Sequence, residues 1–471
     1  MLFNSIPFLF FFIIVTSIYF LIPFKFRWGL LLAASCFFYM FFKPEYILIL
    51  LFTIVIDYIA GIYLEKIEDH AQKRKFLIMS FIANIGVLAV FKYYNFLNDN
   101  ITGVAHLFGF TNHIPFLKMA LPIGLSFHTF QAMSYTIEVY RGNQKAERHF
   151  GIYALYVMFY PQLVAGPIER PQNMLHQFRE KKYFNYDNAV WGLNLIAYGL
   201  FKKLVVADRL SVYVDQVFGN VAGANTSSML IALFLYYFQI YCDFSAYSDI
   251  ARGTAKFMGY DLMINFNRPY LSKNISEYWR RWHISLGSWF SDYLYTPLAT
   301  AKRDWGKWGV IFALLITFLI AGLWHGAAWN FVIFGLLQGV ALSYEFLTRK
   351  WRKKLASKIP SAIYTWGSIA MAFSYWCVGL IFFRSPTFAI ATKVIHKIAE
   401  LNFKFNLAQL CGDKGPLNLV LSFVVVFSLM LRFLLPKDLK MRYSAVFLTV
   451  ITLGIIILGK NVAAEFIYFQ F

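Results

Sequence analysis

The stretch WGVIFALLITFLIAGLWHGAAWNFVIFGLLQGVALSY, residues 308–344, contains no Asp, Glu, Lys or Arg. A membrane-spanning helix needs about 20 predominantly apolar residues, so this stretch is long enough for nearly two crossings of a bilayer. One ionisable side chain, His325, interrupts it. Because hydrocarbon is a poor solvent for a charge, an ionisable residue at such a place marks a functional position by default.

The composition of the whole chain agrees with a membrane protein. Of its 471 residues, 59% are hydrophobic and 14% are charged, with a mean hydropathy of +0.54, whereas soluble domains carry about 25% charged residues. The apolar runs are longer than barrel strands and do not alternate in polarity, so the fold class predicted is an all-α polytopic membrane protein. We expect roughly 11–13 membrane helices. One is expected at residues 2–24, and a second apolar run after the basic cluster reaches residue 42. The others are expected at 46–63, 76–91, 118–137, 151–166, 189–207, 228–242, 308–323, 327–346, 363–383, 417–435 and 443–459.

The basic residues behind the net charge of +20 are distributed along the chain as in a membrane protein. Basic residues form short clusters between apolar runs, as at 25–27, 73–75 and 349–354, which is typical of cytoplasmic loops against anionic headgroups and not of a nucleic-acid interface. Residues 2–24 lack a basic leader and a small-residue cleavage site, which indicates a retained helix. With the basic cluster directly after it, the N-terminus is expected on the extracytoplasmic side.

Residues 243–307 differ from the rest of the chain. They contain the polar stretch NRPYLSKNISEYWRRWHISLG yet are rich in aromatic residues, which favours short re-entrant or interfacial helices. Basic residues at 302–307 and 349–354 flank residues 308–346. They favour a helical hairpin with His325 near its tip, and one long tilted or broken helix is the alternative.

The chain is expected to form one membrane domain over residues 1–471. Its expected parts are N-terminal helices at 1–110, a core with both histidine motifs at 115–345 and C-terminal helices at 360–471.

His325 is the first candidate for chemistry. Neutral imidazole takes up a proton near neutral pH, which suits a general base. Trp324 and Trp329 wall the position, and Gly326 leaves room for another group to approach. A structural histidine bonded to a helix neighbour is the alternative.

His283, in RRWHISLGSWFSDYLYTPL, is the second candidate. Arg280 and Arg281 precede it, and nearby positive charge disfavours the imidazolium form. The alternative is an interfacial histidine among headgroups. Asp292 either orients a histidine or forms a structural ion pair. Trp282 and Ser285 complete the expected lining of the site.

Other polar residues in apolar runs are interpreted as structural. Hydrogen bonding between helices or the lining of a channel accounts for them, and Glu138 and Arg141 have the spacing of a helical ion pair. The others are Asp57, His128, Asp243 and Asp249. The four cysteines show no CxxC or zinc-ligand spacing, so no metal site and no disulfide framework are expected. No P-loop, GxSxG or HExxH motif is present in the sequence, which argues against an ATP-driven pump, a serine hydrolase and a zincin.

RRWHISLGSWFSDYLYTPL followed by AGLWHGAAWNFVIFGLLQG resembles the membrane-bound O-acyltransferase (MBOAT) family, in particular its bacterial AlgI-like branch of alginate O-acetylation proteins. The resemblance extends to LPIGLSFHTFQAMSYTIEVYRG, FYPQLVAGPIERP and YCDFSAYSDIARGTAKFMGYDLMINFNRPY. By this resemblance His325 matches the family's essential histidine, and His283 its second polar position. The chain departs from the pattern at Ser291, where arginine is common, and at His128, where tyrosine is common.

The resemblance implies a funnel of helices with a tunnel between the two membrane faces. An acyl thioester, acetyl-CoA or an acylated carrier, arrives from the cytoplasm as co-substrate, and no bound cofactor is expected. His325 deprotonates the acceptor hydroxyl, while His283 or a backbone N–H stabilises the oxyanion or holds the acyl group. The acceptor is an extracytoplasmic polysaccharide, alginate-like or another envelope glycan. A separate periplasmic or surface SGNH-like acetyltransferase is the expected partner. The protein itself is expected in the inner membrane of a bacterium.

Three alternatives stay open. Peptidoglycan O-acetylation and D-alanyl transfer to teichoic acid belong to the same family. A proton-coupled transporter or channel using the intramembrane histidines is the alternative of another class, but it has no reason to carry the two paired histidine motifs.

Overall fold

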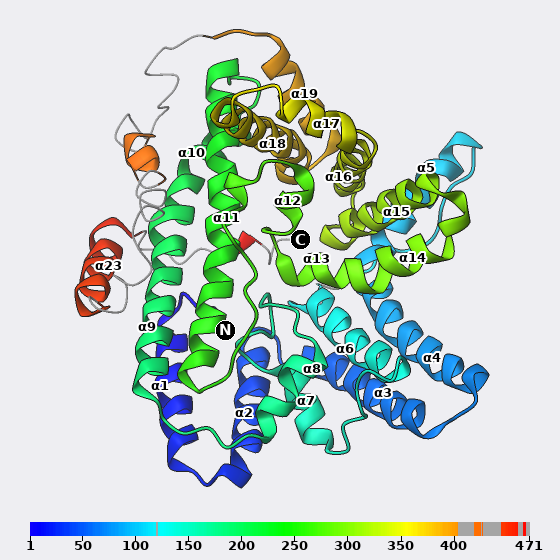
Figure 1. Ribbon diagram of the computed structural model, residues 1–471, viewed down its shortest axis with the longest axis vertical. Helices are drawn as coiled ribbons and strands as arrows, with labels where there is room; N and C mark the ends of the chain where they lie inside the picture. The colour runs from blue at the N-terminus through cyan, green and yellow to red at the C-terminus, as the bar shows by residue number, and fades with distance from the viewer. Residues whose placement is uncertain (119–120, 404–418, 425, 427–443, 460–464, 468–471) are drawn as a thin grey trace. The chain divides into compact units, whose positions relative to one another are not determined.

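All regular structure in the described part of the chain is helical. The computed structural model describes residues 1–118, 121–403, 419–424, 426, 444–459 and 465–467 (Figure 1). Within these ranges the elements are α-, 3-10 and π-helices, with no strand, which confirms the predicted all-α class. In the interior of a helix, every backbone N–H and C=O group is hydrogen-bonded within the same helix, which the hydrocarbon core of a bilayer requires.

The chain divides into two compact units. Unit 1 comprises Met1–Ile196 and Ile250–Met263, and unit 2 comprises Ala197–Asp249 and Ile264–Phe471. Helices α9 (Tyr186–Phe201) and α11 (Thr226–Phe257) each run from one unit into the other.

Unit 1 contains the N-terminal helices. They are α1 (Ile6–Leu21), α2 (Phe24–Met40), α3 (Tyr46–Lys66), α4 (His70–Leu88), η1 (Ala89–Tyr93), α5 (Tyr94–Leu107), α6 (Leu125–Tyr140), α7 (Phe150–Met158), α8 (Pro171–Met174) and η2 (His176–Arg179). Helices α3, α4 and α6 pack against one another. Asp57 of α3 accepts hydrogen bonds from Ser80 (2.5 Å) and Asn84 (2.8 Å) of α4, which confirms the structural role predicted for this carboxylate.

Unit 2 contains the two histidine motifs. Its elements before the second motif are η3 (Lys202–Ala207), α10 (Asp208–Gly219), η4 (Pro269–Leu271), α12 (Ile275–Trp279), α13 (Ile284–Phe290), η5 (Ser291–Tyr295), α14 (Thr296–Ala301) and η6 (Arg303–Trp305). They are followed by α15 (Lys307–His325), α16 (Trp329–Leu347), α17 (Arg349–Ala356), α18 (Ser361–Arg384), α19 (Phe388–Ala399) and α23 (Ser444–Leu458).

The protein is a multi-pass membrane protein. Among the described residues, seven helical stretches are long and apolar enough to span a bilayer. They are Tyr46–Lys66, His70–Leu107, Tyr186–Gly219, Thr226–Phe257, Lys307–His325, Trp329–Leu347 and Ser361–Arg384, with shorter apolar helices at Ile6–Leu21 and Leu448–Leu458. The expected 11–13 helices refer to the whole chain. Among the described residues, several of these apolar runs form helices shorter than the roughly 20 residues that a crossing needs, and most of the run at 417–435 lies outside the described residues.

Three expected segments differ in the structure. The run at 151–166 is helical only to Met158, and Pro161 lies in the irregular segment that follows. The run at 118–137 becomes helical only at Leu125, after Gly124 with φ +78°. Helix α11 continues to Phe257, so the short helices expected over 243–307 begin only at Pro269. Most of the helix expected at 417–435, and Cys411, lie outside the described residues.

Helices α15 and α16 form the predicted hairpin, with His325 as the last residue of its first arm (Figure 1). The arms cross closely at two glycines. A Cβ at Gly322 would overlap the carbonyl oxygen of Phe331, and a Cβ at Gly335 would overlap that of Phe318. Small residues permit such close approach of membrane helices. The hairpin, and not the single broken helix, is therefore the correct alternative.

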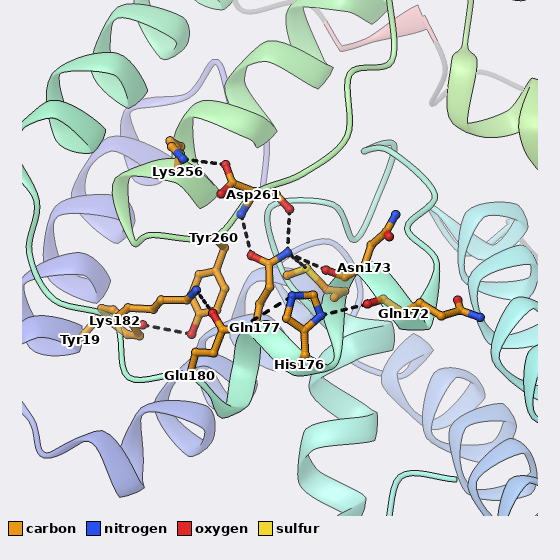
Figure 2. Close-up of polar contacts among 11 residues, drawn as sticks. Tyr19, Gln172, Asn173, His176, Gln177, Glu180, Lys182, Lys256, Tyr260 and Asp261 are labelled. Carbon is orange, nitrogen blue, oxygen red and sulfur yellow. Dashed lines mark hydrogen bonds and ion pairs between the residues drawn. The ribbon is translucent and has the colours of Figure 1, made fainter. Parts of the chain in front are cut away.

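A polar network ties together the non-helical parts of unit 1 (Figure 2). The side-chain amide of Gln177 donates to the carbonyl oxygen of Asp261 (3.0 Å) and accepts from its N–H (2.8 Å). The hydroxyl of Tyr19 donates to that of Tyr260 (3.0 Å). These bonds hold the segment after α11 against α1 and η2, where backbone groups have no helical partners.

We predict that Gly322→Ala destabilises the protein. The added methyl group meets backbone atoms that cannot rotate away, and overpacking of this kind costs about 1–3 kcal/mol. The thermal unfolding midpoint of the purified protein measures the effect. Gly367→Ala in α18 is the control, because its Cβ meets nothing within 4 Å, and its midpoint should stay the same or rise. Equal midpoints for both variants would contradict the close crossing.

Candidate active site

His325 lies at the tip of the hairpin inside an aromatic wall. Its side chain is buried, with the residue 4% exposed. Ring centroids of Trp324, Phe383 and Phe334 lie 5.0, 5.4 and 5.9 Å from the centroid of its imidazole. Gly326 carries no side chain because a Cβ there would overlap the ring of Phe331. Trp324 and Gly326 therefore both lie within the aromatic surroundings of His325.

His283 is held in a backbone conformation that costs energy. It caps α13 in the left-handed region, with φ 46° and ψ 54°. A non-glycine residue there is strained by about 1–3 kcal/mol and persists only where its surroundings hold it. The residue is fully buried, and the N–H of Ile284 donates to the backbone oxygen of Asn265 (2.9 Å). The surrounding structure therefore determines this conformation.

The side chain of Asn265 contacts both His283 and Ser285 and holds this part of the site in place. Its Oδ1 accepts from the N–H (3.1 Å) and the hydroxyl (2.9 Å) of Ser285 and lies 3.2 Å from Nδ1 of His283. Since Oδ1 is an acceptor in all three contacts, Nδ1 of the neutral imidazole carries the proton and Nε2 is left as a proton acceptor. In this tautomer the expected donation from His283 to an oxyanion would have to come from Nδ1, which faces Asn265. Asn265 was missed in the sequence because a lone asparagine in a loop carries no motif.

The two histidines belong to one site in unit 2. The ring of Trp324 lies 6.0 Å from His283 and 5.0 Å from His325, centroid to centroid. Burial lowers the pKa of His283 well below its ordinary value, and the nearby His325 lowers it further. The sequence attributed the neutral form to neighbouring arginines, but Arg281 pairs with Glu277 (2.7 Å). Desolvation is the main cause.

The supporting residues divide into two groups. Trp282 is buried and packs 5.1 Å from Phe266, and Ser285 is buried against Asn265. Trp329 is 58% exposed, and Asp292 is exposed as well. Neither of these two belongs to the buried wall, because sequence proximity to a histidine does not determine the direction of a side chain on the next helix.

The residues interpreted as structural have structural partners. Asp243 pairs with Lys203 (2.7 Å), and Asp249 pairs with Lys202 (2.8 Å). His128 Nε2 lies 2.5 Å from the carbonyl oxygen of Leu163. The expected pair of Glu138 and Arg141 forms at 3.4 Å.

Two cavities lie at opposite ends of the hairpin. The first, about 510 Å³, is at the charged end and is here called the basic cavity; its lining includes Arg280, Glu345, Arg349, Arg352 and Lys353. The second, about 450 Å³, is at the tip and is here called the acidic cavity; its lining includes Asp208, Asp215, Asp243, Phe331, Phe383 and Glu465. The acidic cavity therefore borders the aromatic wall around His325, and the basic cavity lies at the opposite end of the hairpin.

Comparison with known proteins gives a family. The pattern of the membrane-bound O-acyltransferase family matches residues 148–384. The chain is 36% identical over 403 residues to a peptidoglycan O-acetyltransferase of Helicobacter pylori, covering 79% of this chain and 73% of that protein. It is 33% identical over 419 residues to a probable alginate O-acetylase AlgI of Pseudomonas aeruginosa, covering 87% and 76%. A teichoic acid D-alanyltransferase of Bacillus subtilis is 26% identical over 273 residues, covering 56% and 69%.

We predict that His283 makes the folded protein sensitive to acid. Below about pH 6.5 the unfolded chain binds a proton at this position that the folded chain does not, so stability falls as the pH is lowered, by about 1.4 kcal/mol per pH unit. His283→Asn, which keeps a residue tolerant of the left-handed region, should remove that part of the dependence. The measurement is the unfolding midpoint between pH 7 and pH 5.

His396→Asn is the matched control for this experiment, because His396 is exposed on α19. It should keep the pH dependence of the wild type. The same dependence in His283→Asn and in the wild type would show that position 283 is accessible to protons in the folded state.

Proposed function

The chain belongs to the membrane-bound O-acyltransferase family and is an O-acyltransferase, and from this premise we propose that it transfers acetyl groups from a cytoplasmic thioester to an extracytoplasmic polysaccharide. The observation that carries the proposal is the pair of buried histidines around Trp324, with a cavity at each end of the hairpin. Cavities at opposite ends of a membrane hairpin, with two histidines buried at its tip, suit a reaction whose substrates come from opposite sides of a membrane.

His325 is the general base of the proposed reaction. Its neutral imidazole takes the proton of the acceptor hydroxyl while the hydroxyl oxygen attacks the thioester carbonyl carbon. The tetrahedral intermediate then collapses, the C–S bond breaks, and the leaving thiolate receives the proton from the imidazolium. The products are an O-acetyl ester and a thiol. The aromatic wall excludes water, which would otherwise hydrolyse the thioester.

His283 acts in this scheme as a hydrogen-bond acceptor. With its proton on Nδ1 against Asn265, its Nε2 orients the incoming hydroxyl. A buried imidazole whose pKa lies well below the ordinary value stays neutral at pH 7, so it does not bring a second positive charge next to the imidazolium form of His325. Stabilisation of the oxyanion is left to a backbone N–H donor.

The charges at the two ends of the hairpin indicate how it is oriented in the membrane. The basic cavity borders α17, the RKWRKK segment, which the positive-inside rule places at the cytoplasm. An α-helix rises about 1.5 Å per residue, so the 19 residues of α15 carry His325 roughly 27 Å from that end, close to the thickness of the hydrocarbon core. We therefore place the donor at the basic cavity and the acceptor at the acidic cavity. By the same rule, the basic cluster at 25–27 directly after the first apolar run supports an N-terminus outside.

The relatives support acetyl transfer, for which we propose the bacterial inner membrane as the location. Two of their names specify O-acetylation, one of peptidoglycan and one of alginate. D-alanyl transfer to teichoic acid is the weaker candidate, because those relatives share less identity. A separate extracytoplasmic SGNH-like acetyltransferase is the proposed partner, and acetyl-CoA or an acylated carrier is the proposed donor.

We predict that His325→Ala removes ester-linked acetate from the envelope polysaccharide. Loss of a general base reduces the rate by about 10²–10⁴-fold, which should leave acetate near background. The measurement is acetate released by mild alkali from cells that express equal amounts of protein. His396→Ala, the same substitution at an exposed histidine, is the control and should retain wild-type acetate. Wild-type acetate in His325→Ala would refute the mechanism.

We predict that Arg349→Ala combined with Lys353→Ala weakens binding of the donor. Both residues line the basic cavity, and removal of two cations facing a phosphate-bearing thioester should raise the KM for acetyl-CoA about tenfold with little change in kcat. Lys350→Ala combined with Lys354→Ala changes the charge of α17 equally outside the lining of that cavity and is the control. Equal KM values for the two double variants would place donor binding elsewhere.

A further inference from the structure

Residues 94–117, here called the α5 hairpin, lie between the helices that the sequence predicts at 76–91 and 118–137. The structure gives them a defined form (Figure 1). Helix α5 is followed by a return segment, residues 110–117, that runs back beside it and is hydrogen-bonded to it. Both parts belong to unit 1, and neither takes part in the proposed reaction.

The asparagine side chains of the α5 hairpin bond to one another and to its backbone. Asn98 is 2% exposed. Its Nδ2 donates to the carbonyl oxygen of Ile114 (3.0 Å), and its Oδ1 accepts from Nδ2 of Asn112 (2.6 Å). Asn95 donates to the carbonyl oxygen of Leu117 and accepts from its N–H, both at 2.9 Å. These bonds satisfy backbone groups of the return segment that have no helical partner.

The outer surface of the α5 hairpin is apolar. Six of its large apolar side chains are each at least 50% exposed: Ile101, Val104, Leu107, Phe108, Phe110 and Phe116. Residues 93–117 contain no Lys or Arg and a single carboxylate, Asp99. Bonded polar groups inside and bulky apolar groups outside are the reverse of a domain that is surrounded by water. An exposed apolar patch of this kind marks a contact surface.

The apolar side chains of α5 follow one side of the helix. The stripe contains Leu97, Ile101, Val104 and Phe108, spaced four, three and four residues apart. His106 is exposed and lies two residues after Val104, about 200° around the helix axis. Asp99, which is also exposed, lies seven residues before His106 and therefore on the same side as His106. A helix with one apolar side and one polar side is typical of the membrane interface.

The helical stretch that ends in α5 is longer than a bilayer is thick. Helices α4, η1 and α5 form one stretch of 38 residues, His70–Leu107. At about 1.5 Å per residue it measures about 57 Å, nearly twice the roughly 30 Å of the hydrocarbon core. Counted from Lys75, the roughly 20 residues of one crossing end near Tyr94, where α5 begins. The π-helix η1 lies directly before this point, and π-bulges are places where helices bend.

We propose that the α5 hairpin lies in the interface of the extracytoplasmic leaflet, with its apolar stripe against phospholipid acyl chains and with Asp99 and His106 facing water. Lipid is the occupant because the hairpin continues directly from α4, which is itself a membrane-spanning helix. The leaflet follows from the basic cluster at 73–75, which the positive-inside rule places in the cytoplasm at the other end of α4. The inference does not depend on the acyl-transfer reaction.

Fluorescence quenching on the purified full-length protein in phosphatidylcholine nanodiscs tests the contact with lipid. A bimane label is attached at Val104→Cys or at His106→Cys, two exposed positions on opposite sides of the same helix, so that each is the control for the other. Labelling of the four native cysteines is measured on the wild type and subtracted. A nitroxide near the headgroup end of the acyl chain should quench the label at 104 at least about twofold more than the label at 106, and aqueous iodide should give the reverse order.

Membrane vesicles of known orientation test the leaflet. A membrane-impermeant maleimide should modify His106→Cys in right-side-out vesicles and not in inside-out vesicles. It should modify Val104→Cys slowly in both, because the apolar stripe is covered by lipid. Arg74→Cys, in the exposed basic cluster at the start of α4, is the control and should react only in inside-out vesicles.

Four outcomes would overturn the proposal. Equal quenching of both labels by iodide would place α5 in water, and equal quenching of both by the lipid nitroxide would place it upright in the hydrocarbon core. Protection of the label at 104 from both quenchers would show that a second copy of the chain covers the stripe. Reaction of His106→Cys only in inside-out vesicles would place the α5 hairpin in the opposite leaflet.

Discussion

The cost of burying an ionisable group away from water governs the polar architecture of this protein. Several buried charges and imidazoles in the described part of the chain are surrounded by groups that compensate for lost water. Asp57 has Ser80 and Asn84, and Lys203 has Asp243 and Asp208. His283 has Asn265 and remains neutral. These compensations hold the helices in register and determine which groups remain available for chemistry.

The same constraint divides the work between the two histidines. His283 is locked by its backbone conformation and by Asn265, so its tautomer is set before any substrate arrives. His325 is enclosed by aromatic rings at the end of a helix. An imidazole surrounded by apolar rings has little competing water, which in the proposed reaction favours transfer to a hydroxyl over hydrolysis.

The close crossing of α15 and α16 at two glycines positions the aromatic rings around His325. Close contact at Gly322 and Gly335 lets the arms of the hairpin turn within three residues, from Gly326 to Ala328. The turn brings Phe331 and Phe334 of the second arm beside His325 of the first. A bulkier residue at either glycine would separate the arms and open the aromatic wall to water.

The sequence by itself determined the solvent, the helical class, the family and the two histidines, since hydrophobic runs, charge clusters and paired motifs are local properties that one chain displays directly. It also favoured the hairpin, because basic residues flank the run on both sides. Only the tertiary structure identified Asn265, the tautomer of His283 and the two cavities, and it removed Trp329 and Asp292 from the buried wall. These features depend on which side chains meet across elements distant in sequence, as Asn265 meets Ser285 and Phe383 meets His325. The apolar run at 151–166 was likewise misjudged, because hydrophobicity reports burial while the length of a helix depends on where the backbone turns.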